Sequence, residues 1–121
     1  MNVQNLYGYW KMTGMRYVKP DGSWEQEQVL GGSSVITQSG EILTYTRTSE
    51  LGFGYSGKFI VEKDSLVTNV EVCSIPELEK KVIRRTIKQC TPQLLVLGMH
   101  DEATGRDYEI EFNLLTRTFT N

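Results

Sequence analysis

The fold of this chain is decided by the stretch Asp107-Tyr108-Glu109-Ile110-Glu111-Phe112-Asn113-Leu114. Apolar and polar side chains alternate in it without a break. Because successive side chains of a β-strand point to opposite faces, this period of two predicts a strand with one buried and one hydrated face. The row that starts at Tyr108 is predicted to face a core, and the row that starts at Asp107 to face water.

The amino-acid composition extends this prediction to the whole chain. There is one alanine against 29 β-branched residues (10 Val, 7 Ile and 12 Thr), which favours strands over helices. Turn-forming segments such as Lys19-Pro20-Asp21-Gly22 divide the sequence at short intervals. One helical turn is expected at residues 2–7. Eight strands are predicted, at 8–18, 31–38, 41–48, 55–62, 65–74, 81–90, 94–100 and 106–117.

Eight short strands joined by hairpins predict a closed barrel. Closure removes the unpaired edges that an open sheet would leave, and eight strands enclose an interior that side chains fill or that holds one small ligand. A sandwich of two four-stranded sheets is the alternative. The length of 121 residues and mass of 13.8 kDa predict one domain, over residues 1–121.

Charge and motifs exclude several classes of function. The formal net charge is −2 and the 13 Lys and Arg residues are scattered, which argues against nucleic-acid binding. The longest apolar runs, such as residues 94–99, are too short to span a membrane, and no signal peptide is recognisable, so a cytoplasmic protein is expected. Cys73 and Cys90 are predicted to be free thiols. No metal or cofactor motif is present, so neither a metal nor a cofactor is expected.

Several segments resemble the lipocalin-like domain family of the calycin superfamily. The stretch Leu6-Tyr7-Gly8-Tyr9-Trp10 is similar to the L-x-G-x-W opening of lipocalins, and residues 40–46, 55–59 and 70–76 follow in the family's order. The resemblance implies an eight-stranded antiparallel up-and-down barrel with Trp10 at its closed end and Arg117 packed across it. Where the family commonly has a histidine before the V-x-V-x-S segment, this chain has Asn69.

Arg85 is the most informative polar residue. It alternates with Arg84 and Thr86 and shares its face with Ile83 and Ile87, which predicts a guanidinium among apolar neighbours. A buried arginine stays charged and requires a partner. The partner is either internal, for example the Glu71 carboxylate or backbone carbonyls, or the carboxylate, phenolate or enolate of a ligand. A wrong assignment of the strand's faces is the third reading.

The remaining candidate site residues follow from strand alternation and residue type. In the first strand Trp10, Met12, Gly14 and Arg16 are predicted to share the inner face, with Met15 and Tyr17 outside. His100, the only histidine, stands beside Asp101 and is either solvated or a general base. The candidate ligand-binding residues are Trp10, Met12, Arg16, Tyr45, Tyr55, Phe59, Asn69, Arg85, Tyr108, Ile110 and Phe112. The candidate catalytic residues are Arg85, His100, Tyr45 and Glu71.

Two functions remain open at this point. The first is a binding module whose barrel holds a small hydrophobic molecule with an acidic or polar end. The alternative is a cofactor-independent cyclase, isomerase or dehydratase that acts on a polyketide-like or terpenoid intermediate of secondary metabolism, an analogy that rests on fold alone. A barrel filled by its own side chains would instead act through its surface. Met15, Tyr17 and Ile60 on the predicted outer faces would then mark a homodimer interface.

Overall fold

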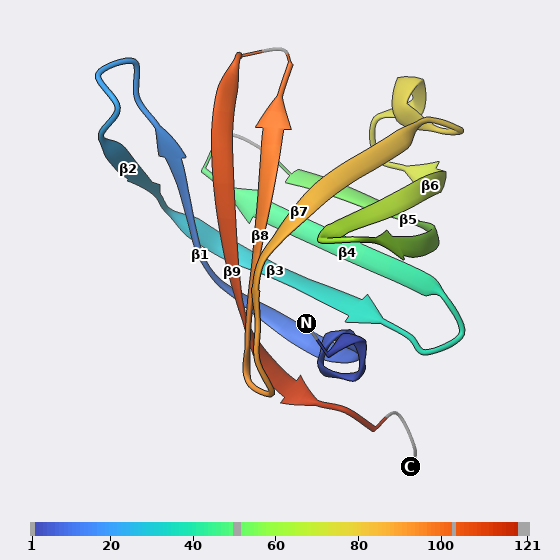
Figure 1. Ribbon diagram of the computed structural model, residues 1–121. Helices are drawn as coiled ribbons and strands as arrows, with labels where there is room; N and C mark the ends of the chain where they lie inside the picture. The colour runs from blue at the N-terminus through green and yellow to red at the C-terminus, as the bar shows by residue number, and fades with distance from the viewer. Residues whose placement is uncertain (1, 50–51, 103, 119–121) are drawn as a thin grey trace.

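The computed structural model describes residues 2–49, 52–102 and 104–118. Nine strands and two short 3₁₀ helices make up this part of the chain (Figure 1). In chain order they are η1 (Val3–Leu6), β1 (Gly8–Val18), β2 (Trp24–Glu27), β3 (Val29–Ile36), β4 (Glu41–Thr48), β5 (Gly52–Glu62), β6 (Ser65–Cys73), η2 (Pro76–Leu78), β7 (Val82–Cys90), β8 (Leu94–Asp101) and β9 (Arg106–Thr116).

The strands close into an antiparallel barrel. Neighbours along the chain pair in the order β3-β4-β5-β6-β7-β8-β9, and β1 closes the ring by pairing with both β3 and β9. In Figure 1, β1 and β9 lie next to each other where their pairing closes the ring. The predicted all-β, eight-stranded up-and-down barrel is therefore confirmed, with β2 as one additional strand.

The additional strand corrects the sequence prediction, which placed no strand between residues 18 and 31. Trp24 begins β2, which pairs with the last residues of β1, from Met15↔Glu27 to Val18↔Trp24. Only Gln28 separates β2 from β3, so the two strands are one strand with a bend. The sequence Trp-Glu-Gln-Glu lacks an apolar row, which is why its strand character was missed.

A bulge in β1 corrects the predicted faces of that strand. Met12 pairs with Phe112, but Gly14 pairs with Glu111, so the register shifts by one residue between them. Beyond the shift Met15 is buried and Arg16 lies on the opposite face, the reverse of the prediction. A glycine inside a strand often marks a bulge, and Gly14 is that signal.

The closed end of the barrel is sealed by Trp10 and Arg117. The Trp10 ring is fully buried and its Nε1 donates to the Leu6 carbonyl at 2.9 Å. The Arg117 guanidinium carbon lies 5.9 Å from the Trp10 ring centre, and its two terminal nitrogens donate to the carbonyls of Tyr7 and Pro92. These contacts confirm the arrangement that the lipocalin resemblance implied.

Candidate functional site

Arg85 lies inside the barrel, on the inner face of β7. Its side chain is 2% exposed, and Ile87 on the same face is also buried, whereas Arg84 and Lys88 on the opposite face are exposed. The predicted alternation of β7 is thus confirmed. A guanidinium cannot lose its charge at any ordinary pH, so the barrel interior carries a fixed positive charge.

The donors of this guanidinium are largely unsatisfied. Arg85 Nε and Nη1 are buried and have no hydrogen-bond partner, and neither does the hydroxyl of Tyr55. The Arg85 guanidinium carbon lies 5.3 Å from the Tyr55 ring centre, so the cation contacts the ring rather than the hydroxyl oxygen. Burial raises the pKa of Tyr55, and the nearby Arg85 charge offsets only part of that effect. The phenol therefore stays protonated and, like Arg85, offers a hydrogen-bond donor.

The Glu71 carboxylate, which was considered as an internal partner for Arg85, does not lie inside the barrel. Glu71 is exposed on β6 and does not reach the interior. Among the described residues, the buried polar side chains other than Arg85 are hydroxyls, with no Asp or Glu. These are Ser34, Thr44, Thr46, Thr48 and Thr68. Within this part of the chain, no buried carboxylate balances the charge of Arg85.

Most of the candidate ligand-binding residues surround the same interior. Trp10, Met12, Tyr55, Phe59, Arg85, Ile110 and Phe112 are buried, and Tyr108 is partly buried against them. Their apolar side chains form two clusters, a large one around Trp10 and Phe112 and a smaller one around Tyr55, Val70 and Cys73. Arg85 contacts the smaller cluster through the Tyr55 ring.

Three candidate ligand-binding residues lie outside the barrel. Arg16 forms an ion pair with Glu109 at 2.7 Å and stacks on Trp24 at 4.1 Å from the ring centre, because the β1 bulge has turned it outward. Tyr45 is 46% exposed, and Asn69 is exposed as well. None of the three is placed to touch a ligand inside the barrel.

The outward position of Tyr45 could have been recognised from the sequence. It shares its face with Glu41 and Arg47, and charged residues at both ends of a row indicate the hydrated face. The inner face of β4 carries the hydroxyls of Thr44 and Thr46 instead. Thr44 hydrogen-bonds Ser34 across the β3–β4 pair. These threonines were not predicted as site residues, because threonine is common in strands and its hydroxyl alone does not indicate a binding site.

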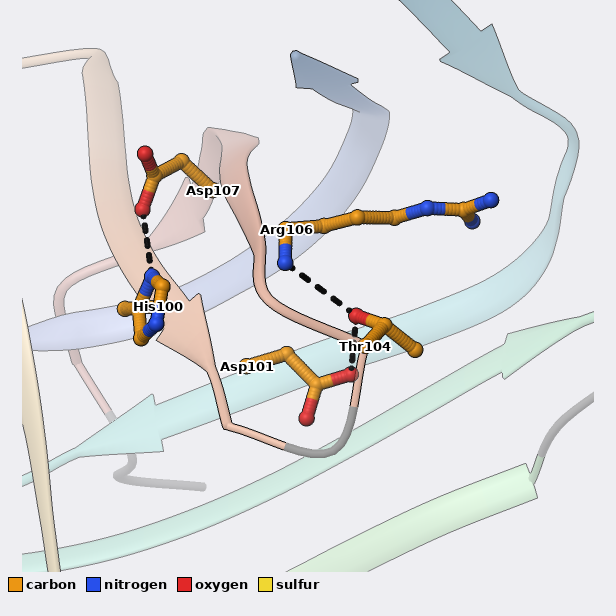
Figure 2. A network of polar contacts seen from close by, with 5 residues as sticks. All are labelled: His100, Asp101, Thr104, Arg106 and Asp107. Atoms are coloured by element: carbon orange, nitrogen blue, oxygen red, sulfur yellow. Dashed lines mark hydrogen bonds and ion pairs between the residues drawn. The ribbon is translucent and has the colours of Figure 1, made fainter. Parts of the chain in front are cut away.

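The candidate catalytic residues do not come together. His100 is exposed at the open end of the barrel, where its Nδ1 pairs with Asp107 Oδ1 at 2.7 Å. Figure 2 shows this pair beside the β8–β9 turn, in which Thr104 donates to Asp101. The side chain of Arg106, the first residue of β9, points away from His100. With Tyr45 and Glu71 also exposed, only Arg85 of the four lies in the interior.

The three residues predicted to mark a dimer interface differ in their exposure. Met15 is buried beyond the β1 bulge and is not available to a partner. Tyr17 is partly buried, with its ring 5.7 Å from that of Tyr108, while Ile60 is exposed as expected. Among the described residues, no helix is long and apolar enough to cross a membrane.

The His100–Asp107 pair leads to a prediction about pH. The hydrogen bond to Asp107 raises the pKa of His100 above its ordinary value of 6.5, and the nearby acidic side chains act in the same direction. The stabilisation is therefore fully present below pH 6.5 and is lost as the pH rises through the raised pKa. An NMR titration of this single histidine should give a lower pKa in Asp107→Asn than in the wild type. An unchanged pKa in the variant would contradict the pairing.

Comparisons with known proteins agree with the barrel. No protein-family model matches the chain, and neither does any curated protein sequence. A lipocalin-like protein from Bacteroides uniformis superposes with a TM-score of 0.57 at 13% identity, covering 92% of this chain and 99% of that one. A de novo designed fluorescence-activating β-barrel gives a TM-score of 0.56 at 16% identity, covering 93% and 95%. An uncharacterised protein from Bacteroides eggerthii gives 0.51 at 15%, covering 87% and 97%.

These similarities are too low in identity to transfer a function, but they cover nearly the whole of each chain. They agree with the closed barrel described above. The chain therefore has the lipocalin-like fold, a closed eight-stranded antiparallel barrel with one extra strand.

Proposed function

We propose that the barrel interior binds a small hydrophobic molecule with an acidic end, and that Arg85 holds the acid. The observation that carries this proposal is the set of buried donors without acceptors, Arg85 Nε, Arg85 Nη1 and the Tyr55 hydroxyl. All three offer a hydrogen-bond proton, and the phenol oxygen, although it can also accept, makes no hydrogen bond in this structure. An anionic oxygen is the group that accepts from such a set.

The energetics of the free protein favour the same conclusion. A buried donor that leaves water without finding an acceptor costs about 1–3 kcal/mol, and a buried unpaired charge costs more. A ligand carboxylate would recover much of this cost through charge-assisted hydrogen bonds. The apolar body of the ligand would pack against the side chains of the two interior clusters. Affinity would thus depend on the acid and the apolar body together.

Binding is better supported than catalysis. A cyclase, isomerase or dehydratase needs a group that moves a proton beside the bound molecule. Tyr45, Glu71 and His100, which were the candidates for that role, are exposed. The interior offers hydroxyls and a permanently charged guanidinium, which suits recognition of an anion.

Titration with parinarate, a fluorescent polyene carboxylate, tests the proposal. Arg85→Met should weaken parinarate binding roughly 10- to 100-fold, since a hydrogen bond to a charged group contributes about 1.5–3 kcal/mol. Arg47→Met is the matched control, because Arg47 is an arginine exposed on the outer face of β4. It should bind within about twofold of the wild type. Equal affinities in wild type and Arg85→Met would remove Arg85 from the site.

A further inference from the structure

The barrel wall is incomplete between β7 and β8. Their pairing runs from Cys90↔Leu95 only as far as Thr86↔Gly98. Beyond that point β8 continues against β9, to Asp101↔Arg106, while β7 continues against β6. Figure 1 shows β7 turning away from β8 on the side of the open end. The split therefore extends from the open end of the barrel down to Thr86 and Gly98.

Arg85 lies at the bottom of this split. It directly precedes Thr86, the last β7 residue that pairs with β8. On the other side of the split, Met99 is the residue next to Gly98, and it pairs with Tyr108 on β9. Met99 and Tyr108 share the inner faces of their strands with buried Leu97 and Ile110. Met99 and Tyr108, on the β8–β9 side of the split, therefore lie at the same height along the barrel as Arg85 on the β7 side.

A groove of about 410 Å³ lies over the split. Its walls include Arg84, Thr86 and Lys88 from the outer face of β7 and His100 from the outer face of β8. Met99 and Tyr108, whose side chains lie on the inner faces of β8 and β9, also line it at the edge of the split.

The free charge of the groove is positive. Its two acidic residues are already paired, Asp107 with His100 and Glu109 with Arg16, each at 2.7 Å. Lys88 makes no ion pair with any described residue, and its side chain lies along Gly98, where a Cβ atom would come within 2.8 Å of Lys88 Cε. Arg84 contacts Glu62 only at 3.5 Å. Positive charge at a groove raises the local concentration of anions and their association rate.

We infer that acidic ligands enter the barrel from the side, through the split between β7 and β8, and that Lys88 and Arg84 attract them into it. This inference rests on the proposed function, since it describes the route to Arg85. Arg85 is 2% exposed, so passage requires a side chain at the split to move. The flexible, half-buried Met99 side chain is the residue placed to move.

A bulky label beside the split tests the route. His100→Cys is modified with a polyethylene-glycol maleimide in a Cys90→Ser background, since Cys90 is only partly buried and Cys73 is buried. Leu43→Cys carries the same label as the control; Leu43 is 57% exposed on β4, across the barrel from β8. Stopped-flow fluorescence then gives the association and dissociation rate constants for parinarate.

The label at His100→Cys should slow association and dissociation at least fivefold each and leave Kd unchanged, because a blocked route affects entry and exit equally. The label at Leu43→Cys should leave both rate constants within twofold. Unchanged rate constants at both positions, or a change in Kd alone, would overturn the route while binding stands. Failure of the unlabelled protein to bind parinarate would overturn the proposed function and the route together.

A charge reversal gives an independent measurement of the same route. Lys88→Glu should lower the association rate constant about tenfold at low ionic strength, and this effect should shrink as salt screens the charge. Lys58→Glu makes the same change in net charge at an exposed position on β5, away from the groove. Equal effects of the two substitutions would show that the groove does not guide the ligand.

Discussion

Replacing Arg85 by methionine is expected to raise the free energy of unfolding of the ligand-free protein by about 1–3 kcal/mol. Methionine keeps the apolar contacts of the side chain and removes a buried charge that has two unpaired donors. The loss of the cation–π contact with Tyr55 opposes this gain, but such a contact contributes about 0.5–2 kcal/mol, less than the cost of a buried unpaired charge. Denaturant unfolding of protein freed of ligand measures the change.

Arg84→Met is the control for this stability measurement. Its guanidinium is exposed and its ion pair with Glu62 is long, at 3.5 Å, so the substitution should change the unfolding free energy by less than about 0.5 kcal/mol. The change in unfolding free energy caused by Arg85→Met is expected to be positive if Arg85 is a ligand-binding residue and negative if Arg85 is a structural residue. If Arg85→Met destabilises the ligand-free protein by more than about 1 kcal/mol, the guanidinium is a structural element with partners inside the barrel.

Replacing Trp10 by alanine is expected to lower the free energy of unfolding by about 3–5 kcal/mol. The ring is fully buried at the closed end of the barrel, and its removal also leaves the Leu6 carbonyl without its donor. Arg117 would lose the ring across which it packs, although its hydrogen bonds to backbone carbonyls remain. Thermal and denaturant unfolding of the variant both report the loss.

Trp24→Ala is the matched control for this second substitution. Trp24 is 41% exposed on the extra strand β2, where it stacks on Arg16. Its removal should cost about 1 kcal/mol or less, since the surface it covers is outside the barrel. Comparable losses in the two tryptophan variants would contradict the assignment of Trp10 as the seal of the closed end.

The sequence was sufficient to predict eight of the nine described strands, because each follows a local pattern, and their number and short turns led to the predicted closure. The alternation from Tyr108 to Leu114 and the turn at residues 19–22 are properties of short segments. The β1 bulge is different in kind, since it depends on how β1 and β9 align across the barrel. Gly14 marks the place, but a glycine alone does not say which residues reverse their faces. The wrong inner position of Arg16 follows from that one shift.

The sequence was sufficient to predict Arg85 and most of the side chains around it, but not how these side chains contact one another. Arg85 was identified because a charged residue interrupts an apolar row, and that signal lies within one strand. Its relation to Tyr55 depends on the packing of β5 against β7 across the interior, which no local pattern contains. Glu71 looked like a partner because its charge is right, but β6 turns its side chain outward. The split at Thr86 and Gly98 depends on the register of two strands and could not be read from either.

The most direct test of the central claim compares parinarate with its methyl ester in wild type and in Arg85→Met. The two ligands share the apolar chain and differ in the acid alone, so the four dissociation constants isolate the interaction between the acid and Arg85. The wild type should prefer the acid over the ester roughly 10-fold or more, and Arg85→Met should bind both about equally. The same preference for the acid in both proteins would show that Arg85 does not hold the acidic end of the ligand.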